Sequence, residues 1–200
     1  MENKNYYKYI KYLIGAIILA LGITLSLLSN VGAGAFDALN FSISKLLNIS
    51  VGTAMYLTIF TIFTIAMILK PRVSYIFGFL LSLMTGFWID IWMQIIPGVN
   101  GLLGGITFFA SSLILLPLGI ALMIKSKMPL SPMDTLMLII AEKTKKSISM
   151  MKTLMEVSFI ILALIFGHYA GIGIGSISIG TVVITFSIGP LIQFFLKFVK

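Results

Sequence analysis

Residues 12–28 read YLIGAIILALGITLSLL, a run without a single charged side chain. About 20 apolar residues in a helix cross the ~30 Å hydrocarbon core of a bilayer. Working outward from this run, we find five more stretches of similar length and character, and two intervening segments, roughly 30–50 and 125–150, that are too polar to span. The predicted spans are 10–29, 51–69, 74–96, 102–124, 152–168 and 174–197.

The composition supports a membrane protein. Of the 200 residues, 59% are hydrophobic and only 10% are charged, whereas soluble domains have ~25% charged residues. We therefore expect the lipid bilayer to surround most of the chain. The absence of cysteine excludes disulfides, thiolate metal sites and a cysteine nucleophile.

The basic residues predict the topology. The net charge of +8 would suggest nucleic acid in a soluble protein, but in a membrane protein Lys and Arg collect in cytoplasmic loops, and we expect no nucleic-acid partner. Of the basic residues, only Lys45 falls outside if both termini are cytoplasmic. The others lie before the first span, between the second and third, between the fourth and fifth, and near the C-terminus.

Two motifs indicate an internal repeat. Residues 21–25 (LGITL) match residues 118–122 (LGIAL), at an offset of 97 (118 − 21). The same offset places Asp37 on Asp134. After a short insertion the offset becomes 103 (181 − 78), which aligns small residues at four-residue spacing, a pattern that lets helices pack closely in lipid. These small residues are Gly78, Ser82 and Gly86 in the first half, and Thr181, Thr185 and Gly189 in the second.

The repeat predicts an inverted architecture. Each half, 1–100 and 101–200, contains three spans, and an odd number of spans reverses the second half in the membrane. The predicted fold is thus an all-α membrane protein of about six transmembrane helices, built as two inverted three-helix repeats in one integral membrane domain. Each repeat has a short half-helix segment after its first span. Inverted repeats recur in transporters, with sites near the midplane at the repeat interface.

Short motifs through nearly the whole chain resemble a known family. In the first half they are GAGAFDAL (32–39), VGTA (51–54) and TGFWID (85–90); in the second half they are LSPMDTL (130–136), GIGIG (171–175) and IGPLIQ (188–193). This pattern resembles the YczE/YyaS/YitT-like family of bacterial membrane proteins. The resemblance implies a multi-spanning protein of the bacterial plasma membrane, without a settled activity.

Asp37 and Asp134 are the first candidate site residues. Each precedes a short apolar run, so each is a natural N-cap of a half-length helix. If both segments enter the membrane, two helix N-termini with carboxylates point toward its centre, as in the broken helices of transporters. The alternative is that both residues cap amphipathic helices at the membrane surface.

Asp90 and Gln193 form a second matched pair, at the offset of 103 (193 − 90). A carboxylate within a span indicates a functional site by default, although an interfacial, solvated Asp90 is an equal alternative. Glu156 is one turn from Lys152 and is explained by an ion pair between them.

We therefore expect a transporter of a small solute or ion with a binding site between the repeats. We expect no enzyme, cofactor or metal site, because no nucleophile with a base and no group of metal ligands is visible. Two alternatives stay open: a substrate-binding membrane subunit of a larger transporter, and an accessory protein that transports nothing. A homo-oligomer or a partner membrane subunit is compatible with each.

Overall fold

The computed structural model describes residues 2–129, 131–146 and 148–199, so Leu130 and Lys200 lie outside the described part. Within it the chain forms α-helices and no strands. The helices are α1 (Glu2–Leu28), α2 (Ala35–Leu47), α3 (Val51–Leu69), α4 (Ser74–Ile95), α5 (Leu102–Ser126), α6 (Pro132–Thr144), α7 (Ile148–Tyr169) and α8 (Ile179–Phe198).

The six predicted spans are confirmed as helices that are long and apolar enough to cross a membrane. They are α1, α3, α4, α5, α7 and α8, while α2 and α6 are helices of 13 residues each. Two starts differ from the prediction: α1 begins at Glu2 rather than near 10, and α8 begins at Ile179 rather than near 174. Gly173 and Gly175 have φ values of +63° and +58°, which a right-handed helix does not allow, so the chain turns here before α8 begins.

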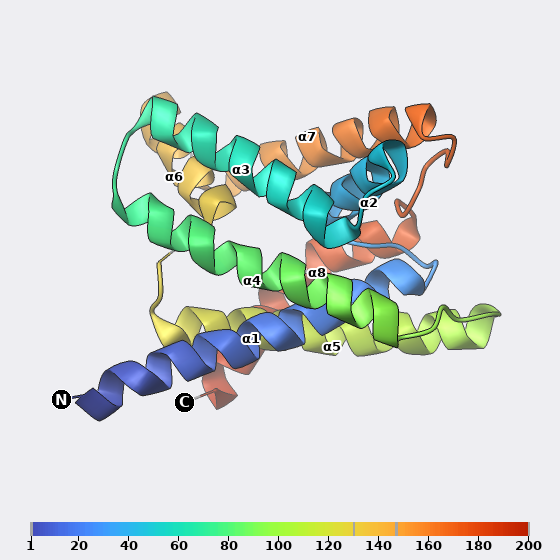
Figure 1. Cartoon of the computed structure of the whole chain (residues 1–200), viewed down its shortest axis with the longest axis horizontal. Helices are drawn as coiled ribbons and strands as arrows, with labels where there is room; N and C mark the ends of the chain where they lie inside the picture. Colours follow the sequence, from blue (N-terminus) through green and yellow to red (C-terminus); the bar gives the residue numbers. More distant parts are fainter. Residues whose placement is uncertain (1, 130, 147, 200) are drawn as a thin grey trace.

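Figure 1 shows how the helices alternate in direction. Both termini and the α3–α4 connection lie at one end of the bundle. The α1–α2, α4–α5 and α7–α8 connections lie at the other. Lys70, just after α3, pairs with Glu142 of α6, which places the C-terminal part of α6 at the same end as the termini. The short helices α2 and α6 therefore follow their spans at opposite ends of the molecule.

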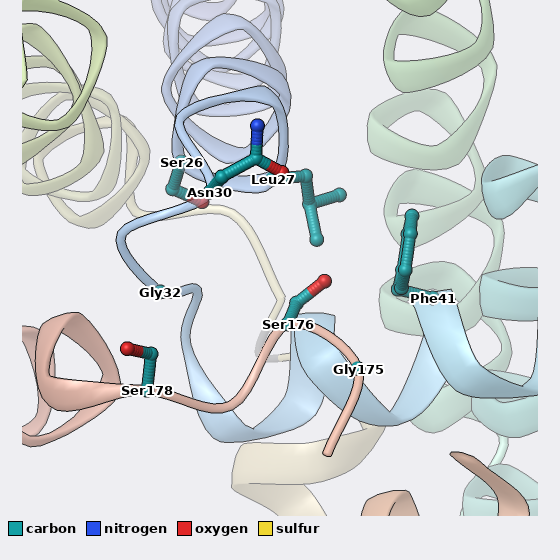
Figure 2. A pocket seen from close by; sticks show the side chains of 8 residues that line it. All are labelled: Ser26, Leu27, Asn30, Gly32, Phe41, Gly175, Ser176 and Ser178. Carbon is teal, nitrogen blue, oxygen red and sulfur yellow. The ribbon is translucent and has the colours of Figure 1, made fainter. Parts of the chain in front are cut away.

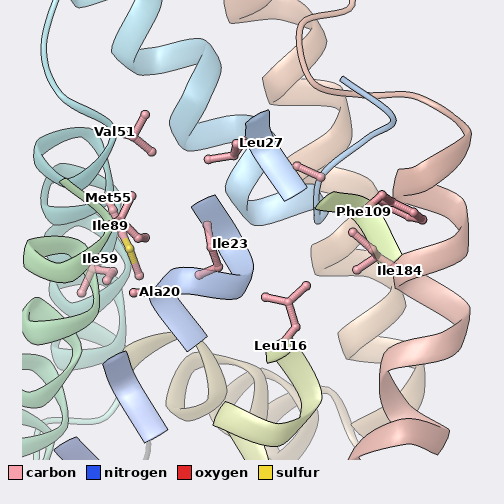
Figure 3. Close-up of a cluster of buried hydrophobic side chains, with 11 residues drawn as sticks. Ala20, Ile23, Leu27, Val51, Met55, Ile59, Ile89, Phe109, Leu116 and Ile184 are labelled. Carbon is pink, nitrogen blue, oxygen red and sulfur yellow. The ribbon is translucent and has the colours of Figure 1, made fainter. Parts of the chain in front are cut away.

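The bundle contains two buried clusters, and α3 contributes residues to both. α1 packs along α5 and also against α4, and α5 packs against α8. Their shared core includes Ile23, Leu116, Phe109 and Ile184, with Ile89 from α4 (Figure 3). The second cluster joins α2, α3, α6 and α7: α2 packs against α7 and α3, and α6 packs against α3 and α7.

The ends of α1 and α5 have the same local geometry. Ser29 Oγ donates to the carbonyl of Ser26 at 2.7 Å and accepts from the amide of Val31 at 3.1 Å. Ser126 Oγ does the same with Met123 and Met128, at 2.6 and 3.3 Å. The two serines are 97 residues apart (126 − 29), the offset found in the sequence.

Left-handed residues repeat at the same offset. Among the described residues, the non-glycine residues with positive φ are Asn30 (58°), Asn48 (58°), Lys127 (55°) and Lys145 (55°). They form two pairs, each 97 residues apart (127 − 30 and 145 − 48). One pair follows α1 and α5, and the other follows α2 and α6, so each pair closes corresponding helices. Left-handed backbone is uncommon outside glycine.

Candidate functional site: carboxylates at the starts of the two short helices

Both short helices begin with an acidic first turn, but the aspartates are not the capping residues that the sequence predicted. The N-cap of α2 is Gly34 and that of α6 is Ser131, so Asp37 and Asp134 each lie three residues after the cap. The sequence-based N-cap assignment was therefore wrong. The electrostatic expectation is kept, since a carboxylate in the first turn still faces the positive end of the helix dipole.

The two helix starts lie in one packed region. Ala35 and Ala38 of α2 share a buried cluster with Leu136 and Ile139 of α6, with Phe159 of α7 among them. Figure 1 shows α2 and α6 alongside the spanning helices α3 and α7. This position favours segments buried within the protein over helices on the membrane surface.

Asp134 is held by its own helix cap. Ser131 Oγ donates to Asp134 Oδ2 at 2.7 Å and accepts from the Asp134 amide at 3.2 Å. This reciprocal arrangement satisfies an otherwise free N–H of the helix start. Tyr12 of α1, a buried residue, interacts electrostatically with the same carboxylate.

Asp37 lacks the corresponding partner. The residue at the position of Ser131 is Gly34 (131 − 97), which has no hydroxyl group. Among the described residues, no group donates a hydrogen bond to the Asp37 carboxylate. Burial, together with the smaller effect of the nearby Glu156 carboxylate, raises the pKa of Asp37 from 3.8 to about 7. The burial of Asp37 thus favours its protonated form over the carboxylate.

Glu156 of α7 is the site residue that sequence reasoning missed. Half-buried, it lies at a hollow together with Asp134, Lys152 and Phe159, and the ring of Phe159 meets Phe36, the neighbour of Asp37, at a centroid distance of 5.3 Å. The available signal was a carboxylate within a predicted span, which we assigned to an ion pair with Lys152. Lys152 is close enough to interact electrostatically with Glu156, but the salt bridge in the described part of the chain is Lys70–Glu142.

Asp90 and Gln193 do not join these groups. Asp90 accepts hydrogen bonds from Ser50 Oγ at 2.6 Å and from the Gly52 amide at 2.7 Å, so its carboxylate caps the N-terminus of α3. Gln193 is exposed on α8. Their matched sequence positions therefore lead to different surroundings, because α4 packs against α1 and α3 while α8 packs mainly against α5.

Comparison with known proteins identifies the family. A family model described as "Family of unknown function (DUF6198)" matches residues 6–197. The chain belongs to this family. The chain is also similar to the protein YyaS of Bacillus subtilis, 33% identical over 96% of this chain and 94% of the relative. The membrane protein YczE of the same organism is 25% identical over 97% and 87%.

The relatives confirm the resemblance seen in the sequence motifs. A protein of Haemophilus influenzae, 27% identical over 96% of this chain and 85% of its own length, shares the same extent. No solved structure matches the chain. Together with the six spanning helices, the likeness to the membrane protein YczE identifies this DUF6198 member as a multi-pass integral membrane protein.

Proposed function

We propose that the protein transports a small solute or ion across the bacterial plasma membrane, with a proton- or cation-binding site formed by Asp37, Asp134 and Glu156. The site lies between two inverted repeats, residues 1–100 and 101–200, and both termini are cytoplasmic.

The observation that carries this proposal is the buried carboxyl group of Asp37, which the charge of Glu156 reaches. Two neighbouring carboxylates in a poorly solvated region do not both ionise without a counter-charge. Asp37 has no hydrogen-bond donor among the described residues, and its pKa is raised to about 7. Such a pair takes up a proton or a cation. Lys152 lies at the same hollow as Asp134 and Glu156 and supplies a positive charge there.

Repeated packing supports the two-repeat architecture. Helices α1 to α4 correspond to α5 to α8 in order and approximate length. The contact of α2 with α7 has its counterpart in that of α6 with α3, and the contact of α1 with α4 has its counterpart in that of α5 with α8. The repeated serine bonds and left-handed residues point the same way. Because α2 and α6 follow their spans at opposite ends, the arrangement favours inverted repeats.

The burial of the short helices supports re-entrant segments. Irregular backbone within a membrane is tolerated only where protein shields it. On α2, buried residues are found from the first turn to Ser44, and α6 is likewise packed between α3 and α7. The two acidic helix starts can therefore approach the membrane interior without meeting lipid.

One observation favours the alternative of a subunit in a larger assembly. Helix α8 buries only Gly180, Thr181 and Ile184, and it carries the exposed polar side chain of Gln193. A polar residue on a mostly apolar outward surface suits a partner helix or a second copy of the chain. A substrate-binding subunit or an accessory protein would use this surface.

Reconstitution tests the transport proposal. Purified protein is placed in liposomes that contain a pH-sensitive dye, and inward gradients of Na⁺, K⁺ or H⁺ are applied in turn. We expect at least one gradient to produce a protein-dependent pH change that Asp37→Asn abolishes. Glu142→Gln is the matched control, because that exposed carboxylate lies outside the cluster and should leave the flux unchanged.

The outcomes separate the functions. Equal fluxes in the wild type and Asp37→Asn would contradict the proposed site. A wild type without any flux would favour the binding-subunit or accessory function, which co-purification of a partner membrane protein would then test.

A further inference from the structure

A second polar feature lies at the end of the bundle away from both termini. A cavity of about 260 Å³ is lined by the connection after α1 and the connection before α8 (Figure 2). Its polar lining is Ser26, Asn30, Ser176 and Ser178, and its apolar lining includes Leu27 and Phe41. None of the carboxylates of the candidate site lines it, so it is a separate feature.

The walls of this cavity are fixed by backbone hydrogen bonds between the two connections. The Ala33 amide donates to the carbonyl of Ser176 at 3.0 Å, and the Gly180 amide donates to the carbonyl of Val31 at 3.0 Å. Gly32 has φ +141°, and a Cβ atom there would lie 2.6 Å from the Thr181 nitrogen. The close approach of the connections thus requires glycine at position 32, and the cavity is a built part of the fold.

The lining offers unused hydrogen-bonding groups. Among the described residues, neither the Asn30 amide nor the Ser176 hydroxyl has a partner in the protein. Figure 2 shows the Ser176 hydroxyl pointing between the side chains of Leu27 and Phe41. Behind Gly175, the hydroxyl of Ser42 is buried to 1% exposure and also lacks a partner in the described chain.

The charge around the cavity selects against cations. Among the residues that the structure describes, no acidic side chain lines it. The ammonium of Lys45 lies 5.2 Å from the centroid of the Phe41 ring, so a positive charge stands beside one of the lining side chains. The volume is just below the ~300–1,000 Å³ of pockets for drug-sized ligands, which restricts the occupant to a small molecule.

We propose that this cavity binds a small polar molecule without positive charge, held by hydrogen bonds to Asn30 and Ser176 and by contact with Phe41. The binding does not require the transport function proposed above, since a substrate-binding subunit would use the same cavity. If the protein is a transporter, the proposal adds the substrate class: a neutral or anionic polar solute binds here, while Asp37 and Glu156 take the proton or cation.

The natural lack of cysteine allows a direct test on the full chain purified in detergent. Ser176→Cys places a thiol in the cavity. Tyr169→Cys, at a position with 75% exposure at the same end of the bundle, is the matched control outside it. Both variants are treated with neutral hydroxyethyl methanethiosulfonate and with cationic trimethylammonioethyl methanethiosulfonate.

For each thiol we compare the reaction rate with the neutral reagent to the rate with the cationic reagent. We expect this ratio to be roughly tenfold higher for S176C than for Y169C, because a local positive charge lowers the concentration of cations. Adding Lys45→Gln should reduce this preference. At S176C the rate should saturate as the neutral reagent is increased, since binding precedes reaction, whereas at Y169C it should rise linearly.

An unreactive S176C thiol, the same reagent preference at both positions, or linear kinetics at S176C would overturn the proposal. If S176C does not fold, Ser178→Cys provides a second thiol in the lining, with the same expectations. None of these measurements depends on transport, so their failure would leave the carboxylate site untouched.

Discussion

Gly119 of α5 lies so close to Leu19 of α1 that a Cβ atom at position 119 would be 2.6 Å from the Leu19 backbone nitrogen. The reciprocal contact exists as well: a Cβ atom at Gly22 would be 2.9 Å from the backbone nitrogen of Leu116. Both pairs are related by the offset of 97 (119 − 22 and 116 − 19). The repeated LG motif therefore forms a reciprocal crossing of α1 and α5, in which each glycine lets the backbone of the other helix come close.

Replacing Gly119 with Ala should destabilise this crossing. The added methyl group meets backbone atoms, which cannot move aside as a side-chain tip can, so the helices must separate. We expect a loss of about 1–3 kcal/mol, measured as a lower midpoint of thermal unfolding in detergent. Gly98→Ala is the control, because no atom lies within 4 Å of its Cβ position; an equal loss in both variants would refute the crossing.

Asp37 should make the protein less stable as the pH rises. Its pKa is about 7 in the folded protein and 3.8 in the reference state, so the folded state binds the proton more tightly. This contribution is fully present below pH 3.8 and is lost as the pH rises through about 7. The midpoint of thermal unfolding, measured from about pH 5 to about pH 8, should fall as the pH rises. Asp37→Asn should remove this fall. If Asp37→Asn loses as much stability with rising pH as the wild type does, another group is responsible for the loss.

Gly34→Ser should give Asp37 the hydrogen bond that Ser131 gives Asp134. A hydroxyl that donates to the carboxylate favours its charged form, so the pKa of Asp37 should fall and the pH midpoint of the stability change should move to lower values. Gly34→Ala is the matched control, since its methyl group reaches the same carboxylate, 2.9 Å from the Cβ position to Oδ2, without a donor. Identical midpoints in both variants would count against the missing hydroxyl as the cause.

Asp90→Asn should affect stability rather than transport. The carboxylate accepts from Ser50 Oγ and the Gly52 amide, and loss of such a helix cap costs ~0.5–2 kcal/mol. We expect a lower unfolding midpoint and a retained gradient-driven pH change in liposomes. Loss of flux in a variant that is still folded would return Asp90 to the candidate site.

The two short helices should expose their ends on opposite sides of the membrane. Lys45 is in the last turn of α2 and Lys143 in the last turn of α6, and both are exposed. In intact cells, a membrane-impermeant maleimide should label Lys45→Cys directly and Lys143→Cys only after permeabilisation. Labelling of both from outside would contradict the inverted topology with cytoplasmic termini.

The sequence predicted what depends on local pattern. Six apolar stretches became six spanning helices because their length and hydrophobicity alone make them soluble in lipid. The capping residues were harder to predict. Ser131 and Asp134 have the residue types and spacing of a capping box, whereas Gly34 has the same spacing to Asp37 but no side chain that could cap. The start of α8 differed by a few residues because glycines with positive φ end the helical pattern without changing its hydrophobicity.

By itself, then, the sequence determined that this chain is a six-span membrane protein with two short acidic helix starts, and it suggested the repeat through the LG and Asp matches. Only the tertiary structure brought Glu156 to Asp37, across 119 residues of chain (156 − 37). Only the tertiary structure placed the Asp90 carboxylate at the N-terminus of α3 and formed the cavity at Ser176. The physical reason is that spanning follows from each segment's own transfer into lipid, whereas a shifted pKa or a cavity exists only where separate helices meet.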